Sequence, residues 1–429
     1  MPHDEPFRVL IAALGSYGDV HPFLAIGREL QRRGNDVVMI LPAMYESLTR
    51  SLGLEFVPAV SIEQFERISS KAELWHPVKG FHVIAEGVAE SLGWFYQAIV
   101  NNHRPGRTGL VMSTLVLGGR VAQETLGIRG VTVHLSPAII RSAIDPPRTP
   151  PLPTASWMPR WWNRLVYRAV DFLVIDRVMT GRLNVFRRSL GLAPVKRVFD
   201  GRIHSPDRVI GLFPDWFAPP PSDWPRQTVL TGFPLYDEAD VTRADPDLEK
   251  FLKEGEPPIA FTPGSAMRYG KEFFSEAVQA CRLLGRRGVL LSRHLEHLPV
   301  NLPREIRHVD YAPFSRLLPR CAAIVHHGGI GTSAQAMAAG TPQLVVPMAH
   351  DQQDNAARLK RLGVSETLPA SKFSAGRAAS LLKEIMNDSH ATSCRAIKER
   401  MSAENPLART AEVIEQAFRG NEPDRPAGR

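Results

Sequence analysis

One glycine-rich segment constrains the fold of this chain more than any other. The apolar run 322–325 predicts a buried strand, and the loop after it, HHGGIGT, leads into a helix that begins near Thr332. A second strand is predicted at 343–346, where Pro347 ends it. Because strands that alternate with helices form parallel sheets, this segment predicts an α/β domain.

The junction between the first of these strands and its helix has the composition of an anion site. Free backbone N–H groups and the positive end of the helix dipole point the same way there. The glycines let a ligand come close to the backbone, and a histidine can donate to a phosphate oxygen. The candidate contacts are His326, Gly328, Gly329, Ile330, Gly331 and Thr332.

Two polar residues follow the second strand. Asp351 and Gln352 stand side by side and offer several acceptors and donors, which suit the vicinal hydroxyls of a sugar. Taken singly, Asp351 fits a helix N-cap, and the two histidines fit an exposed pair on a turn. Together, in this order and spacing, these residues favour a site for a nucleotide diphosphate-sugar.

The whole string 324–359 resembles the donor-binding signature of the family-one glycosyltransferases, which use nucleotide sugars. The resemblance implies an α/β fold of the GT-B type, in which two Rossmann-like domains face a central cleft. It places His326 and the turn 329–332 on the diphosphate, and Asp351 with Gln352 on the sugar. One departure is Ala334, where many members place a glutamate for the ribose.

Length and composition fit a large soluble enzyme. The 429 residues suffice for about two to three domains, and 44% hydrophobic with 22% charged residues argues against wholesale disorder. Cys281, Cys321 and Cys394 lack paired or metal-ligand spacing, which predicts a reduced setting and no metal site. Neither a signal peptide nor a membrane span is expected, so the predicted location is the cytoplasm.

The net charge of +8 raises the question of a nucleic-acid partner. The basic residues are scattered, and no nucleic-acid-binding signature is visible, so we expect no nucleic acid. The excess charge could equally attract an anionic donor or the anionic inner face of a membrane. A peripheral membrane contact therefore stays open.

The amino-terminal half also alternates strands with helices. A helix is predicted at 22–33, followed by Gly34 as its C′ residue, and strands are predicted at 8–14, 37–41, 110–112 and 131–135. Ligands of parallel sheets lie beyond the carboxyl ends of the strands. The loop 15–22, after the first strand, is therefore a candidate site, although its two glycines alone are weak support.

Asp19 in this loop is the candidate general base. Transfer of a sugar to a hydroxyl needs a group of matched basicity within hydrogen-bond reach of that hydroxyl. The resemblance implies a base in the same loop, a histidine in many plant members and an aspartate in many bacterial ones. His21 is the orienting or alternative base, and the other reading of Asp19 is a helix cap. The region 110–114 offers no carboxylate for a plant-type dyad, which fits a single-residue base.

The carboxyl-terminal half is predicted to repeat the α/β pattern, with a helix at 273–284 and strands at 257–262, 288–292 and 306–310. Gly264 and Ser265 follow the first of these strands, and the resemblance implies that they approach the donor phosphates and sugar. It also implies that Tyr311 packs against the nucleobase. A core or surface tyrosine is the alternative.

A polar, proline-rich stretch in the middle of the chain predicts an interdomain linker. The predicted domains are an acceptor-binding domain over 1–220 and a nucleotide-sugar-binding domain over 221–400. The segment 401–429 is predicted to be a helix that returns toward the first domain, followed by a tail.

Aromatic residues of the first half mark the predicted acceptor site. Most tryptophans of the chain fall near 75–96 and 157–167, and arginines interleave them in the second segment. One explanation is ordinary core and helix packing. The other is an apolar acceptor tunnel with a basic mouth, resting on a membrane as amphipathic Trp/Arg helices do. The acceptor-binding candidates are Trp75, Phe95, Trp161 and Arg164.

Strings such as LFPDWFAPP at 212–220 and TGFPL at 231–235 resemble the rhamnosyltransferases of rhamnolipid synthesis. That resemblance implies inverting, metal-independent transfer of L-rhamnose from dTDP-L-rhamnose to a 3-(3-hydroxyalkanoyloxy)alkanoate, with no cofactor besides the donor. Three alternatives stay open: a UDP-glucose-dependent glucosyltransferase acting on a lipid, sterol or natural product, a sugar epimerase, and a non-catalytic partner of another transferase.

Overall fold

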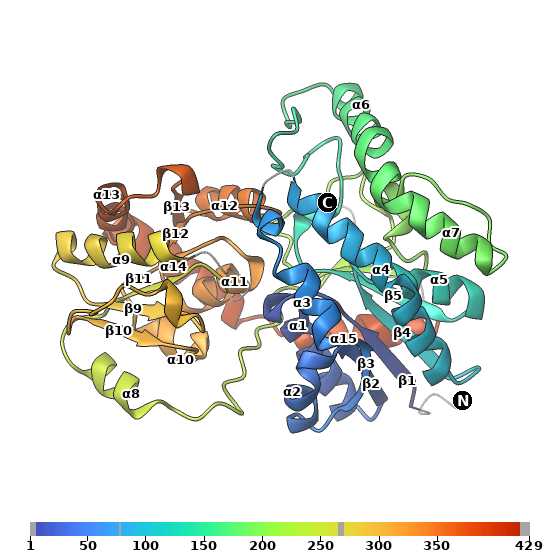
Figure 1. The fold of residues 1–429 in the computed structure, drawn as a ribbon, viewed down its shortest axis with the longest axis horizontal. Helices are drawn as coiled ribbons and strands as arrows, with labels where there is room; N and C mark the ends of the chain where they lie inside the picture. Colours follow the sequence, from blue (N-terminus) through green and yellow to red (C-terminus); the bar gives the residue numbers. More distant parts are fainter. Residues whose placement is uncertain (1–5, 77–78, 265–269, 421–429) are drawn as a thin grey trace.

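The computed structural model describes residues 6–76, 79–264 and 270–420. Two parallel β-sheets lie side by side, the first on the right of Figure 1 and the second on the left. The first has seven strands in the order β3-β2-β1-β4-β5-β6-β7, and the second has six in the order β10-β9-β8-β11-β12-β13. The predicted α/β class with two Rossmann-like sheets is confirmed.

The first sheet and its helices come from the amino-terminal half of the chain. Its strands are β1 (Arg8–Ala12), β2 (Asp36–Pro42), β3 (Glu55–Val60), β4 (Thr108–Ser113), β5 (Arg129–His134), β6 (Arg208–Gly211) and β7 (Thr228–Leu230). The accompanying helices are α1 (Tyr17–Arg32), α2 (Glu46–Ser51), α3 (Ile62–Ser69), α4 (Lys79–Asn102), α5 (Leu117–Leu126), α6 (Arg160–Val170), the π-type η4 (Asp171–Thr180) and α7 (Gly181–Ser189). Short helical turns are η1 (Ala43–Tyr45), η2 (Ala72–Trp75), η3 (Pro137–Ile139) and η5 (Val198–Arg202).

The second sheet comes from the carboxyl-terminal half. Its strands are β8 (Ile259–Thr262), β9 (Gly288–Leu291), β10 (Ile306–Val309), β11 (Ala323–His326), β12 (Gln343–Val345) and β13 (Ser365–Thr367). Its helices are α8 (Pro246–Lys253), α9 (Lys271–Leu284), α10 (Phe314–Leu317), α11 (Ile330–Ala339), α12 (Gln352–Arg361), α13 (Ala375–Ile385) and α14 (Asp388–Ser402), and the chain continues into α15 (Pro406–Phe418).

Most predicted elements form, with two kinds of difference. Helix α1 begins five residues before the predicted start at Pro22, because Ser16 and Asp19 close its amino end. Pro22 therefore lies inside the helix, where its missing N–H removes one backbone bond. Strands β3, β6, β7 and β13 were not predicted, since none of them has a clear alternating apolar pattern.

Apolar clusters cover both faces of each sheet. Helices α1 and α15 pack on one face of the first sheet, and α4 and α5 pack on the other. A further cluster joins Val209 and Phe213 of the first half to Met337 and Val345 of the second. This shared core holds the two sheets against each other.

The last helix returns to the first sheet. Residues of α15 belong to the core on the α1 side of that sheet, and Glu415 accepts a hydrogen bond from Arg33 at 2.7 Å. Strand β7 pairs in the first sheet although it follows residue 220. No helix among the described residues is both long and apolar enough to span a bilayer.

Candidate active site

Asp19 lies in the first turn of α1, directly beyond the carboxyl end of β1. Its Oδ2 accepts hydrogen bonds from the backbone N–H of Ser16 at 2.7 Å and from the Ser16 hydroxyl at 2.8 Å. Gly15 adopts a φ of +139°, and a Cβ there would lie 2.4 Å from the same Oδ2. Asp19 thus closes the helix end through one oxygen, while Oδ1 takes no part in these bonds.

The environment of Asp19 makes its carboxyl more basic. Burial raises its pKa, the two hydrogen bonds from Ser16 oppose this, and the Asp351 carboxylate raises it further. Asp351 belongs to the other half of the chain, so the second half adds to the shift that burial of Asp19 produces. A carboxylate whose pKa moves toward neutrality suits a general base.

His21 is directed elsewhere. It lies two residues after Asp19, about 200° around the helix. Its Nε2 is 2.8 Å from Glu238 Oε1, and its ring contacts Tyr236 edge-on at a centroid distance of 5.5 Å. The structure therefore pairs His21 with the linker and does not bring it to the Asp19 carboxyl.

The junction of β11 and α11 has the predicted geometry of an anion site. Gly329 is the N-cap, so α11 begins at Ile330, two residues before the predicted start. The N–H groups of Ile330, Gly331 and Thr332 are the first of the helix and have no acceptor within it. A Cβ at Gly331 would meet no atom within 4 Å, so the space above this turn is open. Helix α11 also contacts α1, which carries Asp19.

His326 does not have a free nitrogen for a diphosphate, which corrects the prediction from sequence. The Gly328 N–H donates to its Nδ1 at 3.1 Å, so the ring proton resides on Nε2. Nε2 lies 3.0 Å from Gln343 Oε1. Because His326 is the last residue of β11 and fully buried, its ring fastens the glycine loop to β12.

The neighbouring His327 lies against Gly329, the N-cap of α11. Its ring lies between two glycines: a Cβ at Gly264 would come within 2.8 Å of Cε1, and a Cβ at Gly329 within 2.4 Å of Nε2. Its Nδ1 is buried with no hydrogen-bond partner in the described part of the chain. The sequence has two adjacent histidines, and no local pattern shows which of them keeps an unbonded ring nitrogen. Ser265, the other predicted contact in this loop, lies outside the described residues.

Asp351 is the N-cap of α12, and its carboxylate is part of a buried network. Its Oδ2 accepts from Asn355 Nδ2 at 2.9 Å, and the same amide lies 3.0 Å from Gly328 O. The Ser136 hydroxyl donates to Asn355 Oδ1 at 3.2 Å. Burial raises the pKa of Asp351, and the hydrogen bonds from Asn355 and Ser136 oppose the shift.

Asn355 and Ser136 are site residues that sequence reasoning missed. Asn355 is fully buried and joins the glycine loop, the Asp351 loop and the first half of the chain. Asn355 comes one helical turn after Asp351, and this spacing could have indicated from the sequence that the two side chains meet. Gln352 is 3% exposed, and its Oε1 accepts from the N–H groups of Met348 and Ala349 at 2.8 and 3.0 Å. Gln352 therefore shapes the loop that presents Asp351.

Tyr311 follows β10 and lies at the junction of the two halves. Its hydroxyl donates to the carbonyl of Asp237 in the linker at 2.6 Å. The Arg293 guanidinium lies 5.5 Å from the centre of the Tyr311 ring and 4.6 Å from that of Tyr17 in α1. Arg293, also unpredicted, thus bridges the two halves next to the proposed nucleobase position.

Comparison with known proteins decides the family. Residues 9–144 match the model "Glycosyltransferase family 28 N-terminal domain", and residues 289–417 match "Erythromycin biosynthesis protein CIII-like, C-terminal domain". O-mycaminosyltylonolide 6-deoxyallosyltransferase of Streptomyces fradiae is 30% identical over 436 residues, covering 95% of this chain and 97% of that protein. This chain belongs to the glycosyltransferases.

Solved structures agree on the fold of this glycosyltransferase. The glycosyltransferase of kitacinnamycin superposes with a TM-score of 0.76 at 19% identity, covering 97% of this chain and 100% of that one. A Streptomyces sp. SF2575 glycosyltransferase complexed with thymidine diphosphate gives 0.63 at 19% identity, over 96% and 99% of the two chains. The predicted GT-B architecture and the prediction of a nucleotide-sugar-dependent hexosyltransferase are confirmed.

The predicted acceptor residues of the glycosyltransferase do not gather in one place. Phe95 is fully buried in the core between α4 and the first sheet, so its ring has no face left for an acceptor. Trp161 is 64% exposed, and it and Arg164 lie on the outward face of α6. Trp75 ends the turn η2, and its side chain lies outside the described part of the structure.

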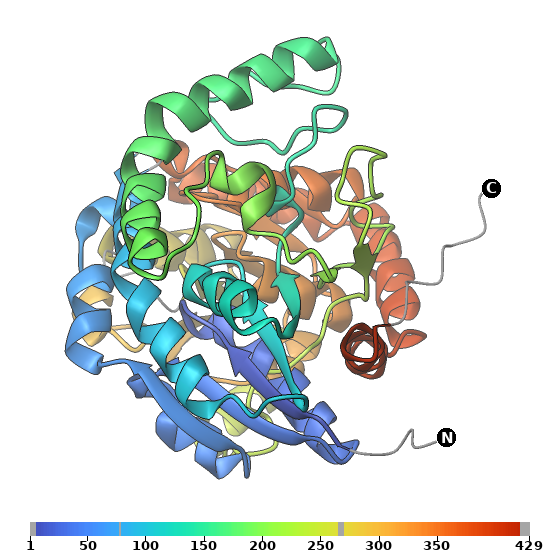
Figure 2. The same cartoon turned by 90° about the vertical axis from the view of Figure 1, so that its right-hand side faces the viewer.

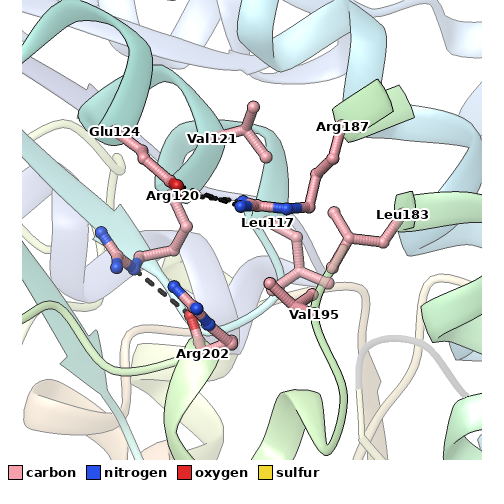
Figure 3. A pocket seen from close by; sticks show the side chains of 8 residues that line it. All are labelled: Leu117, Arg120, Val121, Glu124, Leu183, Arg187, Val195 and Arg202. Atoms are coloured by element: carbon pink, nitrogen blue, oxygen red, sulfur yellow. Dashed lines mark hydrogen bonds and ion pairs between the residues drawn. The ribbon is translucent and has the colours of Figure 1, made fainter. Parts of the chain in front are cut away.

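Two of the cavities of the glycosyltransferase lie in its first half. Figure 3 shows one between α5 and α7, where Arg187 pairs with Glu124 at 2.7 Å beside Arg120 and Arg202. Its volume of about 20 Å³ holds roughly one water molecule and no substrate. The other, about 460 Å³, has the size of a ligand pocket. It is lined by His82, Val83, Glu86, Arg177, Val178, Gly181, Arg182 and Val185.

No cluster of three or more metal-ligating side chains occurs among the described residues.

The buried histidines predict that the glycosyltransferase loses stability in mild acid. Burial lowers the pKa of His204 and His327 to about 4 and that of His326 to about 3. Below pH 6.5, about the pKa of an unfolded histidine, the unfolded chain binds protons that these histidines do not bind in the folded chain. The free energy of unfolding is therefore full above that pH and decreases as the pH is lowered. We expect a loss on the order of 2 kcal/mol per histidine between pH 7 and 5, measured by urea unfolding. A free energy of unfolding that stays constant over this range would contradict the prediction.

Proposed function

We propose that this glycosyltransferase moves L-rhamnose from dTDP-L-rhamnose to a hydroxyl of a 3-(3-hydroxyalkanoyloxy)alkanoate-type lipid, with inversion and without metal or further cofactor. The observation that carries the chemistry is the meeting of α1 and α11. One supplies the half-buried Asp19 carboxylate, and the other supplies free N–H groups beside His327. A base on one side and an anion site on the other are what a single displacement at a sugar carbon needs.

The proposed donor, dTDP-L-rhamnose, is chosen because its sugar is a 6-deoxyhexose. The relative from Streptomyces fradiae is named for the transfer of a 6-deoxyallosyl group, and one structural neighbour holds thymidine diphosphate. L-Rhamnose is likewise a 6-deoxyhexose, and the mid-chain strings resemble rhamnosyltransferases. Asp351, held by Asn355, is the proposed contact for the sugar hydroxyls.

In the proposed reaction, Asp19 removes the proton from the acceptor hydroxyl as its oxygen attacks the anomeric carbon. The bond from that carbon to the diphosphate oxygen breaks on the opposite face, which inverts the configuration. The N–H groups of Ile330, Gly331 and Thr332 receive the charge that develops on the departing diphosphate. We assign the donating side chain to His327, because both nitrogens of His326 are already bonded. These groups supply the stabilisation that a metal would otherwise provide.

The cavity of about 460 Å³ supports an acceptor site in the first half of the chain. It lies between α4 and the helical segment η4–α7, and its wall combines three valines with Glu86, Arg177 and Arg182. The beginning of α4 touches the donor side, since a Cβ at Gly80 would lie 3.2 Å from the ring of His350. An apolar chain held along α4 would therefore extend from the neighbourhood of Asp351.

A macrolide hydroxyl is the second candidate acceptor. The relative that is 30% identical acts on O-mycaminosyltylonolide by its name, and its similarity spans nearly the whole chain. This candidate keeps the donor, the base and the mechanism, and changes only the molecule that fills the acceptor cavity.

A series of acceptors tests the proposal. Purified protein with dTDP-rhamnose is expected to glycosylate hydroxyacyl dimers, with kcat/KM rising about fourfold for each added methylene that is buried, until the cavity is filled. Products are identified by mass spectrometry, with UDP-glucose as the control donor. Transfer to a macrolide aglycone with rejection of every hydroxyacyl acceptor would replace the lipid by the second candidate. A failure of dTDP to raise the melting temperature would refute the donor assignment itself.

A further inference from the structure

Large apolar side chains are exposed to solvent on the outward face of α6 and at the start of η4. The first of them, Trp157, lies in the loop before α6, and the others recur at the spacing of one helix face. The exposed fractions are 80% for Trp157, 64% for Trp161, 51% for Leu165, 69% for Phe172 and 54% for Leu173. In Figures 1 and 2 this helix stands at the outer edge of the molecule. We call these five residues, with the arginines described next, the outer face.

A row of arginines runs beside the apolar row. Arg160, Arg164 and Arg168 are exposed one helical turn apart. Arg160 and Arg164 directly precede residues of the apolar row, and Arg168 comes four residues before Phe172. They make no ion pair with any residue in 6–76, 79–264 or 270–420. The sole acidic residue between positions 157 and 175 is Asp171, which is 2% exposed and accepts from Arg141 at 2.7 Å. The outer face is therefore apolar and positively charged throughout.

The opposite side of α6 fixes this orientation. Asn163 is fully buried and donates to the carbonyls of Ala143 and Ala155, each at 3.0 Å. The Tyr167 hydroxyl donates to Ser142 O at 3.2 Å, and the Arg141 guanidinium lies 5.0 Å from the centre of the Tyr167 ring. Since α6 cannot rotate without breaking these bonds, the outer face stays presented to solvent.

We propose that the outer face docks the protein on a lipid bilayer that carries anionic headgroups. Guanidinium groups bind headgroup phosphates, and tryptophan rings favour the boundary between headgroups and acyl chains, so the two rows match the two layers of a bilayer surface. The net charge of +8 attracts the protein to the same surface. A second copy of the chain fits less well, because a two-fold contact would set like-charged arginine rows against each other.

Docking through α6 would hold the donor side near the same membrane. The loop before α6 reaches α12, where the Arg148 N–H donates to Asp354 Oδ1 at 2.9 Å and Asp145 lies 4.0 Å from Arg358. Helix α12 begins directly after Asp351. The membrane docking goes beyond the proposed function, because the protein would bind the bilayer in the same way if its acceptor were a soluble molecule.

Vesicle binding tests the inference with matched variants. The full-length protein is expected to sediment with vesicles of phosphatidylglycerol and phosphatidylcholine in equal parts, more weakly with phosphatidylcholine alone, and less at high salt. Arg164→Gln with Arg168→Gln is expected to weaken binding about 25-fold, roughly fivefold per arginine. Arg361→Gln with Arg395→Gln, the same charge change on exposed residues of α12 and α14, is expected to leave most binding intact.

A second pair of variants separates the apolar row. Trp157→Ala with Trp161→Ala is expected to lower the partition at least tenfold, whereas Leu283→Ala with Val300→Ala, at exposures of 64% and 88%, is expected to change it little. A retained melting-temperature increase with dTDP shows that each variant is folded. Equal loss in the control pairs, or no sedimentation of the unmodified protein, would overturn the inference. Dimerisation that depends on Trp161, without vesicle binding, would assign the face to self-association and overturn it too.

Discussion

Asp19→Asn is expected to lower the transfer rate by a factor of about 10² to 10⁴ while leaving the affinity for dTDP nearly unchanged. The amide keeps the size of the carboxyl, and its oxygen can still accept from Ser16, so the end of α1 is preserved. What disappears is the basicity that burial and Asp351 produce. The two measurements are kcat with dTDP-rhamnose and calorimetric titration with dTDP.

The pH profile gives the same prediction a second readout. Because the pKa of Asp19 is raised, kcat/KM is expected to fall as pH decreases through that raised value, where the base becomes protonated. Asp388→Asn, at the exposed beginning of α14, is the control. A variant of Asp19 that retains most of its turnover would show that this residue only closes the helix.

His327→Ala is expected to weaken dTDP binding about 10- to 100-fold, the effect of losing a hydrogen bond to a charged group. The ring lies at the beginning of α11 with an unpartnered Nδ1, and burial keeps it neutral by lowering its pKa to about 4. A neutral imidazole still donates through one nitrogen. Isothermal titration with dTDP is the measurement.

Two further variants separate a contact with the ligand from a structural role of His327. His327→Gln keeps an N–H donor and is expected to recover part of the affinity. Gly264→Ala would place a Cβ within 2.8 Å of the ring and is expected to weaken binding by displacing it. His390→Ala in α14 is the control. Unchanged dTDP affinity in His327→Ala would leave the anion site to the backbone of α11 alone.

The donor loop was predictable because its information is local. An apolar run, a glycine turn and a helix start occur within a dozen residues, and their chemistry does not depend on distant parts of the chain. The start of α11 directly after the glycine turn was therefore predicted within two residues. The choice between His326 and His327 was wrong, because it depends on Gln343 and on the direction of each ring.

Sites that depend on packing were not predictable in the same way. Phe95 was expected at the acceptor and lies in the core, since an aromatic residue in a helix carries no mark of which face is buried. His21 was expected near Asp19 and pairs with Glu238, more than two hundred residues later in the chain. Asn355 was not predicted as a site residue because its partners come from three separate segments of the chain.

The sequence by itself determined the two α/β halves, the family resemblance and the loops that end β1, β11 and β12, because periodicity and turn chemistry act over short distances. Tertiary structure alone decided how those loops are used. It brought α1, which carries Asp19, against α11 at the glycine loop, and it turned the outer face of α6 toward solvent. The physical reason is that burial, electrostatic coupling and side-chain direction arise only when distant segments pack together.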